Sequence, residues 1–195
     1  MTRTPIALAL LLAALAGCGG PSSSSPSSAK TANPNAKEAS PAGDIPDNQA
    51  YVAYSPPGAD YSVKVPEGWA RTAAGGAVTF TDKLNSIRME EASAKGAASA
   101  ALAKRIELPR LAKSVKGYKA GKVSVVKRTA GPALRITYLA LSPPDPVTGK
   151  TRTDAVERYL FVRNGKRVAL TLSGPKGADN VDPWKIVTDS LKWTR

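Results

Sequence analysis

The chain has 195 residues, with 28 lysines and arginines, 15 aspartates and glutamates, one cysteine and no histidine. Without histidine it cannot form a Ser–His or Cys–His catalytic pair or a histidine-based zinc site. We therefore expect no catalytic residue, no metal and no cofactor. The formal net charge of +13 suits either a well-solvated surface or an anionic partner.

A short apolar segment precedes the single cysteine. After Arg3, residues 6–16 are all Ile, Leu or Ala. As a helix this segment is about 16 Å long, too short for a hydrocarbon core of about 30 Å. The pattern is typical of an export signal. The end of the segment resembles the lipobox of bacterial lipoproteins, formed by Leu15, Ala16, Gly17 and Cys18.

The lipobox resemblance implies cleavage after Gly17 and a diacylglyceryl thioether on Cys18. Two or more acyl chains, such as palmitate, anchor a protein stably, so we expect a lipid-anchored protein on the extracytoplasmic face of the bacterial cell membrane. An ordinary signal peptide with an incidental Cys18 is the alternative.

Composition divides the chain into three parts. Residues 1–17 form the predicted signal peptide. Residues 18–50 are rich in Ser, Pro and Ala, with no aromatic residue, and predict a lipidated N-terminus on a flexible tether. Residues 51–195 are long enough for one domain.

The domain carries seven predicted strands. Alternating apolar residues and turn signals place them at residues 61–65, 77–81, 86–91, 122–129, 133–141, 155–162 and 167–172. Asn164 and Gly165 between the last two predict a tight hairpin. The proline-rich residues 143–150 predict a long loop.

Two helices are expected in the middle of the domain. Residues 97–105 are Ala-rich, and Pro109 suits the first turn of a second helix. The apolar face of that second helix is predicted to contain Leu108, Leu111, Ala112 and Val115.

The chain closes with another predicted helix. Asp182 is a suitable N-cap and Pro183 suits the first helical position. Val181 and Ile186 have the spacing of a hydrophobic staple. The expected apolar face consists of Trp184, Val187 and Leu191.

These elements predict an α+β fold, an antiparallel sheet flanked by helices. Residues 60–69, a strand followed by Pro-Glu-Gly-Trp, resemble the opening of PsbP-like and Mog1-like domains. Residues 178–193 resemble their closing helix. The chain thus resembles a bacterial lipoprotein with a PsbP/Mog1-like (LpqN-like) domain. The resemblance implies an α/β/α sandwich that binds or assembles other proteins. Metal sites of some PsbP relatives use histidine, which this chain lacks.

Four carboxylates could in principle supply a hydrolase pair: Glu90, Glu91, Asp154 and Glu157. Glu90 and Glu91 are neighbours on a predicted strand and should face opposite sides. Glu157 adjoins Arg158 on a strand that we expect at an exposed edge. An envelope hydrolase is therefore the weakest functional hypothesis.

A short acidic cluster precedes the last helix. Asp179, Asn180 and Asp182 lie close together, but the ligand spacing of a calcium-binding EF-hand is missing. Capping of the helix explains Asp182 without a metal.

Positive charge is concentrated in one region. Residues 104–135 contain ten basic residues and one acidic residue, Glu107. Gathered on one face, they could bind an anionic polymer or lipid headgroups; scattered over both faces, they form a solvated surface. The candidate anion-binding residues are Lys104, Arg105, Arg110, Lys113, Lys116, Lys119 and Lys122.

Two principal hypotheses of function remain. The first is a non-catalytic module that binds or assembles with an envelope protein partner. The second is a binding module for anionic polymer or headgroups. Nucleic acid would suit the charge, but the expected extracytoplasmic location argues against it.

Overall fold

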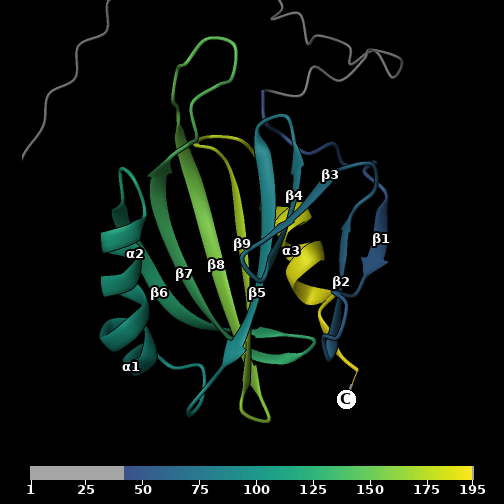
Figure 1. Ribbon diagram of the computed structural model, residues 1–195, viewed down its shortest axis with the longest axis vertical. Helices are drawn as coiled ribbons and strands as arrows, with labels where there is room; N and C mark the ends of the chain where they lie inside the picture. The colour runs from purple at the N-terminus through teal and green to yellow at the C-terminus, as the bar shows by residue number, and fades with distance from the viewer. Residues whose placement is uncertain (1–41, 195) are drawn as a thin grey trace, which may run out of the picture. The chain divides into compact units, whose positions relative to one another are not determined.

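A seven-stranded antiparallel sheet forms the centre of the protein, in a computed structural model that describes residues 42–194 (Figure 1). These residues belong to one compact unit, Glu38–Arg195. The predicted signal peptide, the lipobox with Cys18 and most of the tether lie outside the described residues.

The strands of the large sheet follow a simple antiparallel order. From edge to edge they are β3 (Ala70–Ala74), β4 (Ala77–Asp82), β5 (Asn85–Ser93), β9 (Lys166–Pro175), β8 (Thr153–Arg163), β7 (Gly131–Leu141) and β6 (Lys119–Arg128). A second, three-stranded sheet contains β1 (Tyr51–Tyr54), β2 (Tyr61–Pro66) and β10 (Lys192–Trp193). Hairpins therefore make most of the connections, as the turn signals predict.

Two hairpins in the large sheet have turns with positive φ at both central residues. Between β8 and β9, Asn164 and Gly165 have φ of 50° and 73°. Between β3 and β4, Gly75 and Gly76 have φ of 57° and 76°. This conformation matches the right-handed twist of the strands and is strained for most side chains. The predicted Asn164–Gly165 hairpin is confirmed.

Side-chain alternation divides the sheet into two faces. On β9, Leu170 and Leu172 belong to one hydrophobic cluster and Ala169 belongs to another. The first cluster packs against the small sheet and α3 (Val181–Asp189), including Trp184 and Val187. We call this side the α3 face.

The opposite face packs against a helical segment of α1 (Ala100–Leu102), η1 (Ala103–Glu107) and α2 (Leu108–Ser114). We call it the helix-segment face; its cluster includes Ala103, Leu111 and Leu134. Figure 1 shows this segment and α3 on different sides of the sheet. The predicted antiparallel sheet flanked by helices is confirmed. No helix in residues 42–194 is long and apolar enough to cross a membrane.

The prediction of two separate middle helices was wrong. Residues 100–114 form one helical run, in which the Leu108 N–H donates to the carbonyl of Ala103, five residues earlier. Pro109 has no N–H to donate, and a π turn directly before it lets the helix continue through the proline. Leu111 is buried as expected, but Ala112 is exposed.

The predicted start of the last helix was also wrong. Asn180, not Asp182, is the N-cap residue, and α3 begins at Val181. The Asn180 side chain instead accepts from the Ile45 N–H at 2.8 Å and donates to the Gly43 carbonyl at 3.0 Å. Val181 is 72 % exposed and Ile186 is also exposed, so the expected staple does not form. A tertiary hydrogen-bond cluster has replaced local capping.

Those same contacts move the start of the folded part before residue 51. Ile45 is buried in the α3-face cluster, although its composition places it in the predicted tether. The Asn85 side chain donates to the Gly43 carbonyl at 2.9 Å. Residues 43–45 are therefore part of the domain, because distant asparagines satisfy their backbone groups.

Among the described residues, the sequence pattern did not predict three strands: β1, β3 and β10. All five residues of β3 are exposed, so no apolar alternation marks it. Strand β10 has two residues and exists because Lys192 and Trp193 pair with Ser62 and Tyr61. Such strands are defined by their partners and not by their own pattern.

Candidate functional site

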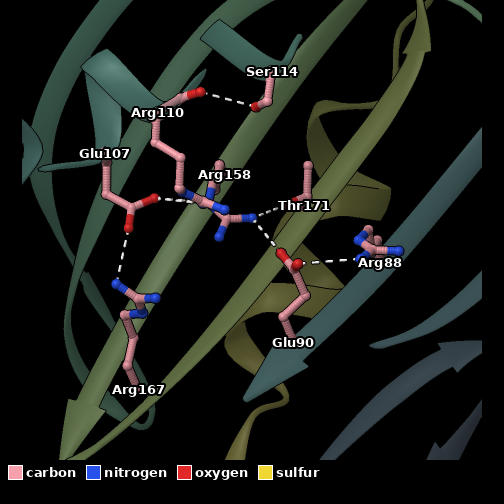
Figure 2. A network of polar contacts seen from close by, with 8 residues as sticks. All are labelled: Arg88, Glu90, Glu107, Arg110, Ser114, Arg158, Arg167 and Thr171. Atoms are coloured by element: carbon pink, nitrogen blue, oxygen red, sulfur yellow. Dashed lines mark hydrogen bonds and ion pairs between the residues drawn. The ribbon is translucent and has the colours of Figure 1, made fainter. Parts of the chain in front are cut away.

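A buried arginine lies at the centre of the helix-segment face. Arg158 comes from β8, and its side chain is 4 % exposed. Its Nη1 donates to Glu90 Oε2 at 2.8 Å and to Thr171 Oγ1 at 2.6 Å, and its Nε donates to Glu107 Oε2 at 3.2 Å (Figure 2). Glutamates from two different elements therefore hold one guanidinium group.

Glu107, the only acidic residue in the basic region, is the most buried member of this network. Its side chain is 0 % exposed. Besides Arg158, it accepts from Arg110 Nη2 at 2.9 Å and from Arg167 Nη1 at 2.9 Å. A buried carboxylate is tolerated when it is fully paired, and three guanidinium groups achieve this here.

The two glutamates of the network favour ionisation. Burial by itself raises the pKa of Glu107, but hydrogen bonding from Arg110 and the charges of Arg158, Arg110 and Arg167 hold it below its ordinary value. Burial likewise raises the pKa of Glu90, and Arg158 and Arg88 lower it further than burial raises it. Arg88 contacts Glu90 at 3.2 Å. Both carboxylates are thus negatively charged at neutral pH.

A cavity of about 250 Å³ adjoins the network. It lies beside the β3–β4 turn, and its lining includes Gly75, Gly76, Glu90, Arg110, Arg158 and Arg167. Three arginines and two glutamates, Glu90 and Glu91, line it, so its lining carries an excess of one positive charge. The cavity is therefore suited to an anionic ligand.

Glu157 lies in a second polar group on the α3 face. It is ion-paired with Arg135 and accepts from the Tyr159 hydroxyl at 2.6 Å. Arg128 donates to that hydroxyl at 3.1 Å and to Thr188 of α3 at 2.9 Å. The expected position of Glu157 on an exposed edge was wrong, because β8 lies between β7 and β9.

The other two candidate carboxylates are also ion-paired. Asp154 is buried and contacts Arg152 at 2.9 Å, and burial raises its pKa despite that arginine. Glu91 contacts Lys166 at 3.5 Å. Glu90 and Glu91 do occupy opposite faces, since their partners on β9 are Ala169 and Val168. Each of the four candidate carboxylates therefore has a lysine or arginine partner.

The predicted anion-binding residues are distributed over three elements and one turn. Lys104 and Arg105 lie on η1, Arg110 and Lys113 on α2, Lys116 in the following turn, and Lys119 and Lys122 on β6; all are exposed. Arg110 is ion-paired with Glu107. Within residues 42–194, the other six make no ion pair. Lys119 lines a separate, largely apolar cavity with Trp184, on the α3 face.

The acidic cluster before α3 has a structural use. Asp179 donates its N–H to Asp44 Oδ1 at 2.9 Å, and Asn180 bonds to residues 43, 45 and 85. Among the described residues, no group of three His, Cys, Asp or Glu side chains is placed to hold a metal ion.

Sequence reasoning missed Arg158, Arg167 and Arg88. One signal was available: Glu157 and Arg158 interrupt an apolar strand, and charged residues in a buried strand require partners. The partners themselves come from β5, β9 and η1, and only the fold brings them together.

No protein-family model and no curated protein matches the sequence. Among solved structures, the chain is similar to the cyanobacterial PsbP of Synechocystis (TM-score 0.50, 16% identity, covering 74% of this chain and 93% of that one). It is also similar to the Ran-binding protein Mog1p of Saccharomyces cerevisiae (0.51, 10%, 75% and 96%).

A protein from Bacteroides thetaiotaomicron shows a similar likeness (TM-score 0.50, 17% identity), but the match covers 73% of this chain and only 48% of that longer chain. Such low identities establish the fold and nothing finer. The described residues have the PsbP/Mog1-like α+β fold that the sequence motifs predict.

Proposed function

We propose that the chain is a lipid-anchored extracytoplasmic protein whose domain binds a protein partner of the cell envelope without catalysing a reaction. The lipobox resemblance at Cys18 supports the anchor and the location. The fold supports the binding role by analogy, because Mog1p, one of the similar structures, is named for binding the protein Ran.

The proposal that the domain is not catalytic is supported by one observation: every candidate carboxylate is paired with a basic side chain. Glu90, Glu91, Asp154 and Glu157 each contact a lysine or arginine. A general acid near neutral pH needs a carboxyl group that keeps its proton, and a general base needs access to a substrate proton. The lowered pKa of Glu90 opposes the acid role, and Asp154, although its pKa is raised, is buried and paired with Arg152.

Crosslinking in intact cells, followed by mass spectrometry of captured peptides, tests the partner. We expect one envelope protein to be crosslinked reproducibly to residues of the domain. The Cys18→Ser variant provides the matched control for the anchor: the unaltered protein should enter the detergent phase of a phase-separation extract, and the variant should remain in the aqueous phase. Aqueous partitioning of the unaltered protein would refute the lipid anchor.

The second candidate is a module for anionic polymer or headgroups. Its support is the set of exposed basic side chains on η1, α2 and β6 that make no ion pair with the described residues. Binding of this kind weakens steeply with added salt, whereas a packed protein interface responds modestly.

A triple variant separates these two candidates. In the non-lipidated Cys18→Ser protein, Lys113→Gln, Lys116→Gln and Lys119→Gln together should abolish retention on anionic vesicles if the second candidate holds. Lys64→Gln, Lys150→Gln and Lys176→Gln remove equal charge from exposed positions outside this region. Equal retention of both triple variants excludes the second candidate.

A further inference from the structure

We propose that the cavity lined by Arg110, Arg158 and Arg167 is a binding site for a phosphate group. Three of its lining side chains are guanidinium groups from α2, β8 and β9, brought to one place by the tertiary fold. Of the seven predicted anion-binding residues, Arg110 lines this cavity and the other six do not. The site is independent of the proposed protein partner.

The ion pairs around the cavity carry an excess of positive charge. Arg88, Arg110, Arg158, Arg167 and Lys166 contribute five positive charges, and Asp60, Glu90, Glu91 and Glu107 contribute four negative ones. The excess of one favours an anion over a neutral ligand, and the arrangement of the N–H donors decides which anion fits best.

The arginines retain donors for such a ligand. A guanidinium group has five N–H donors. Among the described residues, Arg110 uses one in its bond to Glu107, and Arg167 uses one in its own bond to Glu107. Planar guanidinium groups bind phosphate oxygens through paired N–H donors, so the remaining donors suit this chemistry.

The position of Arg158 is fixed before any ligand arrives. Glu107 holds its Nε, and Glu90 and Thr171 hold its Nη1 (Figure 2). Because the side chain is already ordered, binding costs little further conformational entropy. A buried cation held by two glutamates is thus the rigid centre of the site, and the more exposed Arg110 adjoins it.

The cavity has the size and rim for a small phosphate compound. Its volume of about 250 Å³ exceeds that of the phosphate group alone and leaves room for a small substituent. Gly75 and Gly76 form part of its lining at the β3–β4 turn, and a Cβ added at either position would meet open space. The glycines therefore serve the turn conformation and leave the entrance free of side chains.

Isothermal titration calorimetry of the full chain in detergent, at pH 7.5 and constant ionic strength, tests the site. Inorganic phosphate should bind with one site per chain, and acetate should bind at least about tenfold more weakly, a difference of about 1.4 kcal/mol. If phosphate shows no saturable binding up to 10 mM, the proposal is overturned. A dissociation constant of 10 mM corresponds to a binding free energy of about 2.7 kcal/mol in the 1 M standard state.

Two arginines of the same network provide a matched pair of variants. Arg110 and Arg88 have side chains 44 % and 43 % exposed, and each contacts one network glutamate. Arg110 lines the cavity and Arg88 does not. Arg110→Gln should weaken phosphate binding at least about tenfold and Arg88→Gln less than about twofold. Equal losses would indicate a diffuse field of charge and overturn the site, as would no loss in either variant.

Competition identifies the source of the phosphate. Glycerol 3-phosphate represents a phosphomonoester such as a headgroup or polymer terminus, and inorganic phosphate represents the free ion. Each must displace the other if both occupy this cavity; failure of competition contradicts a single site. The tighter ligand indicates the source. A negative result would leave the crosslinking test of the proposed function unaffected.

Discussion

The two faces of the central sheet differ in the kind of side chain that they bury. The α3 face is filled by large apolar and aromatic side chains, among them Phe161, Leu170 and Trp184. The helix-segment face has a smaller apolar cluster, and where β5, β8 and β9 meet it carries buried charges. Apolar burial stabilises without requiring any one geometry, whereas buried charges stabilise little overall and require specific partners. The contrast indicates that the α3 face provides stability and the helix-segment face provides the candidate site.

The largest expected effect comes from breaking the ion network. Glu107→Gln removes the negative charge that three arginines share, leaving Arg158 under-compensated where its side chain is 4 % exposed. We expect a loss of about 3–5 kcal/mol in the free energy of unfolding, measured by urea denaturation. Glu67→Gln, at an exposed position, should change stability by less than about 0.5 kcal/mol. Equal stability of the two variants would show that the charge of Glu107 is not needed to compensate a buried arginine.

A cavity on the α3 face should cost a comparable amount by a different mechanism. Leu170→Ala removes apolar contacts from a side chain that is 0 % exposed. We expect a loss of about 2–5 kcal/mol, with no change in phosphate binding after correction for the unfolded fraction. Val147→Ala, at a fully exposed loop position, is the matched truncation and should be near neutral. Loss of phosphate affinity in the folded Leu170→Ala protein would contradict the division of roles.

Alkaline pH should weaken the α3 face through two of its buried tyrosines. Burial, with the hydrogen bond to Glu157, raises the pKa of Tyr159 to about 12. Burial, with the charge of Glu91, raises the pKa of Tyr61 to about 12. The unfolded tyrosines lose their protons first, near pH 10, so this stability is present below pH 10 and is lost as the pH rises toward 12. The loss should be about 2–3 kcal/mol per tyrosine.

The alkaline prediction can be checked by denaturation at several pH values and by ultraviolet titration of tyrosine. Tyr159→Phe should reduce the slope of stability against pH between 10 and 12. An unchanged slope in this variant would show that Tyr159 titrates normally in the folded protein.

Acidic pH should weaken the helix-segment face, because the pKa shifts of its glutamates are opposite in sign to those of the tyrosines. The pKa values of Glu90 and Glu107 are lowered in the folded state, so the unfolded chain takes up these protons first as the pH falls. The stability is present above the ordinary glutamate pKa and is lost as the pH falls through the folded values. Denaturation between pH 7 and pH 3 should show a shallower decline for Glu107→Gln than for the unaltered protein. Parallel curves would contradict a charged Glu107.

Local patterns predicted much of the fold because they depend on neighbouring residues. Apolar alternation located the seven strands of residues 61–172, and Asn164–Gly165 located a hairpin whose dihedral angles only such residues adopt easily. Where distant residues compete, the local rules failed. Asn180 did not cap with its side chain, because the backbone of residues 43 and 45 occupies that side chain.

The candidate site could be predicted only in part. Arg110 was among the expected anion-binding residues, and Glu107 was visible as an isolated acid in a basic region. Arg158 and Arg167 lie outside that region, more than fifty positions later in the sequence, and reach Glu107 because the helical segment packs against β8 and β9. The choice of partner for each charge depends on which strands are adjacent.

The sequence by itself determined seven of the ten described strands, the Asn164–Gly165 turn, the α+β class and the absence of histidine chemistry, because each depends on composition or short-range spacing. Only the tertiary structure decided which charges are buried together, where the folded part begins and which arginines line a cavity. The physical reason is that desolvation and ion pairing act between residues close in space, and the distance in space between β5, β8, β9 and the helical segment is set by the whole sheet.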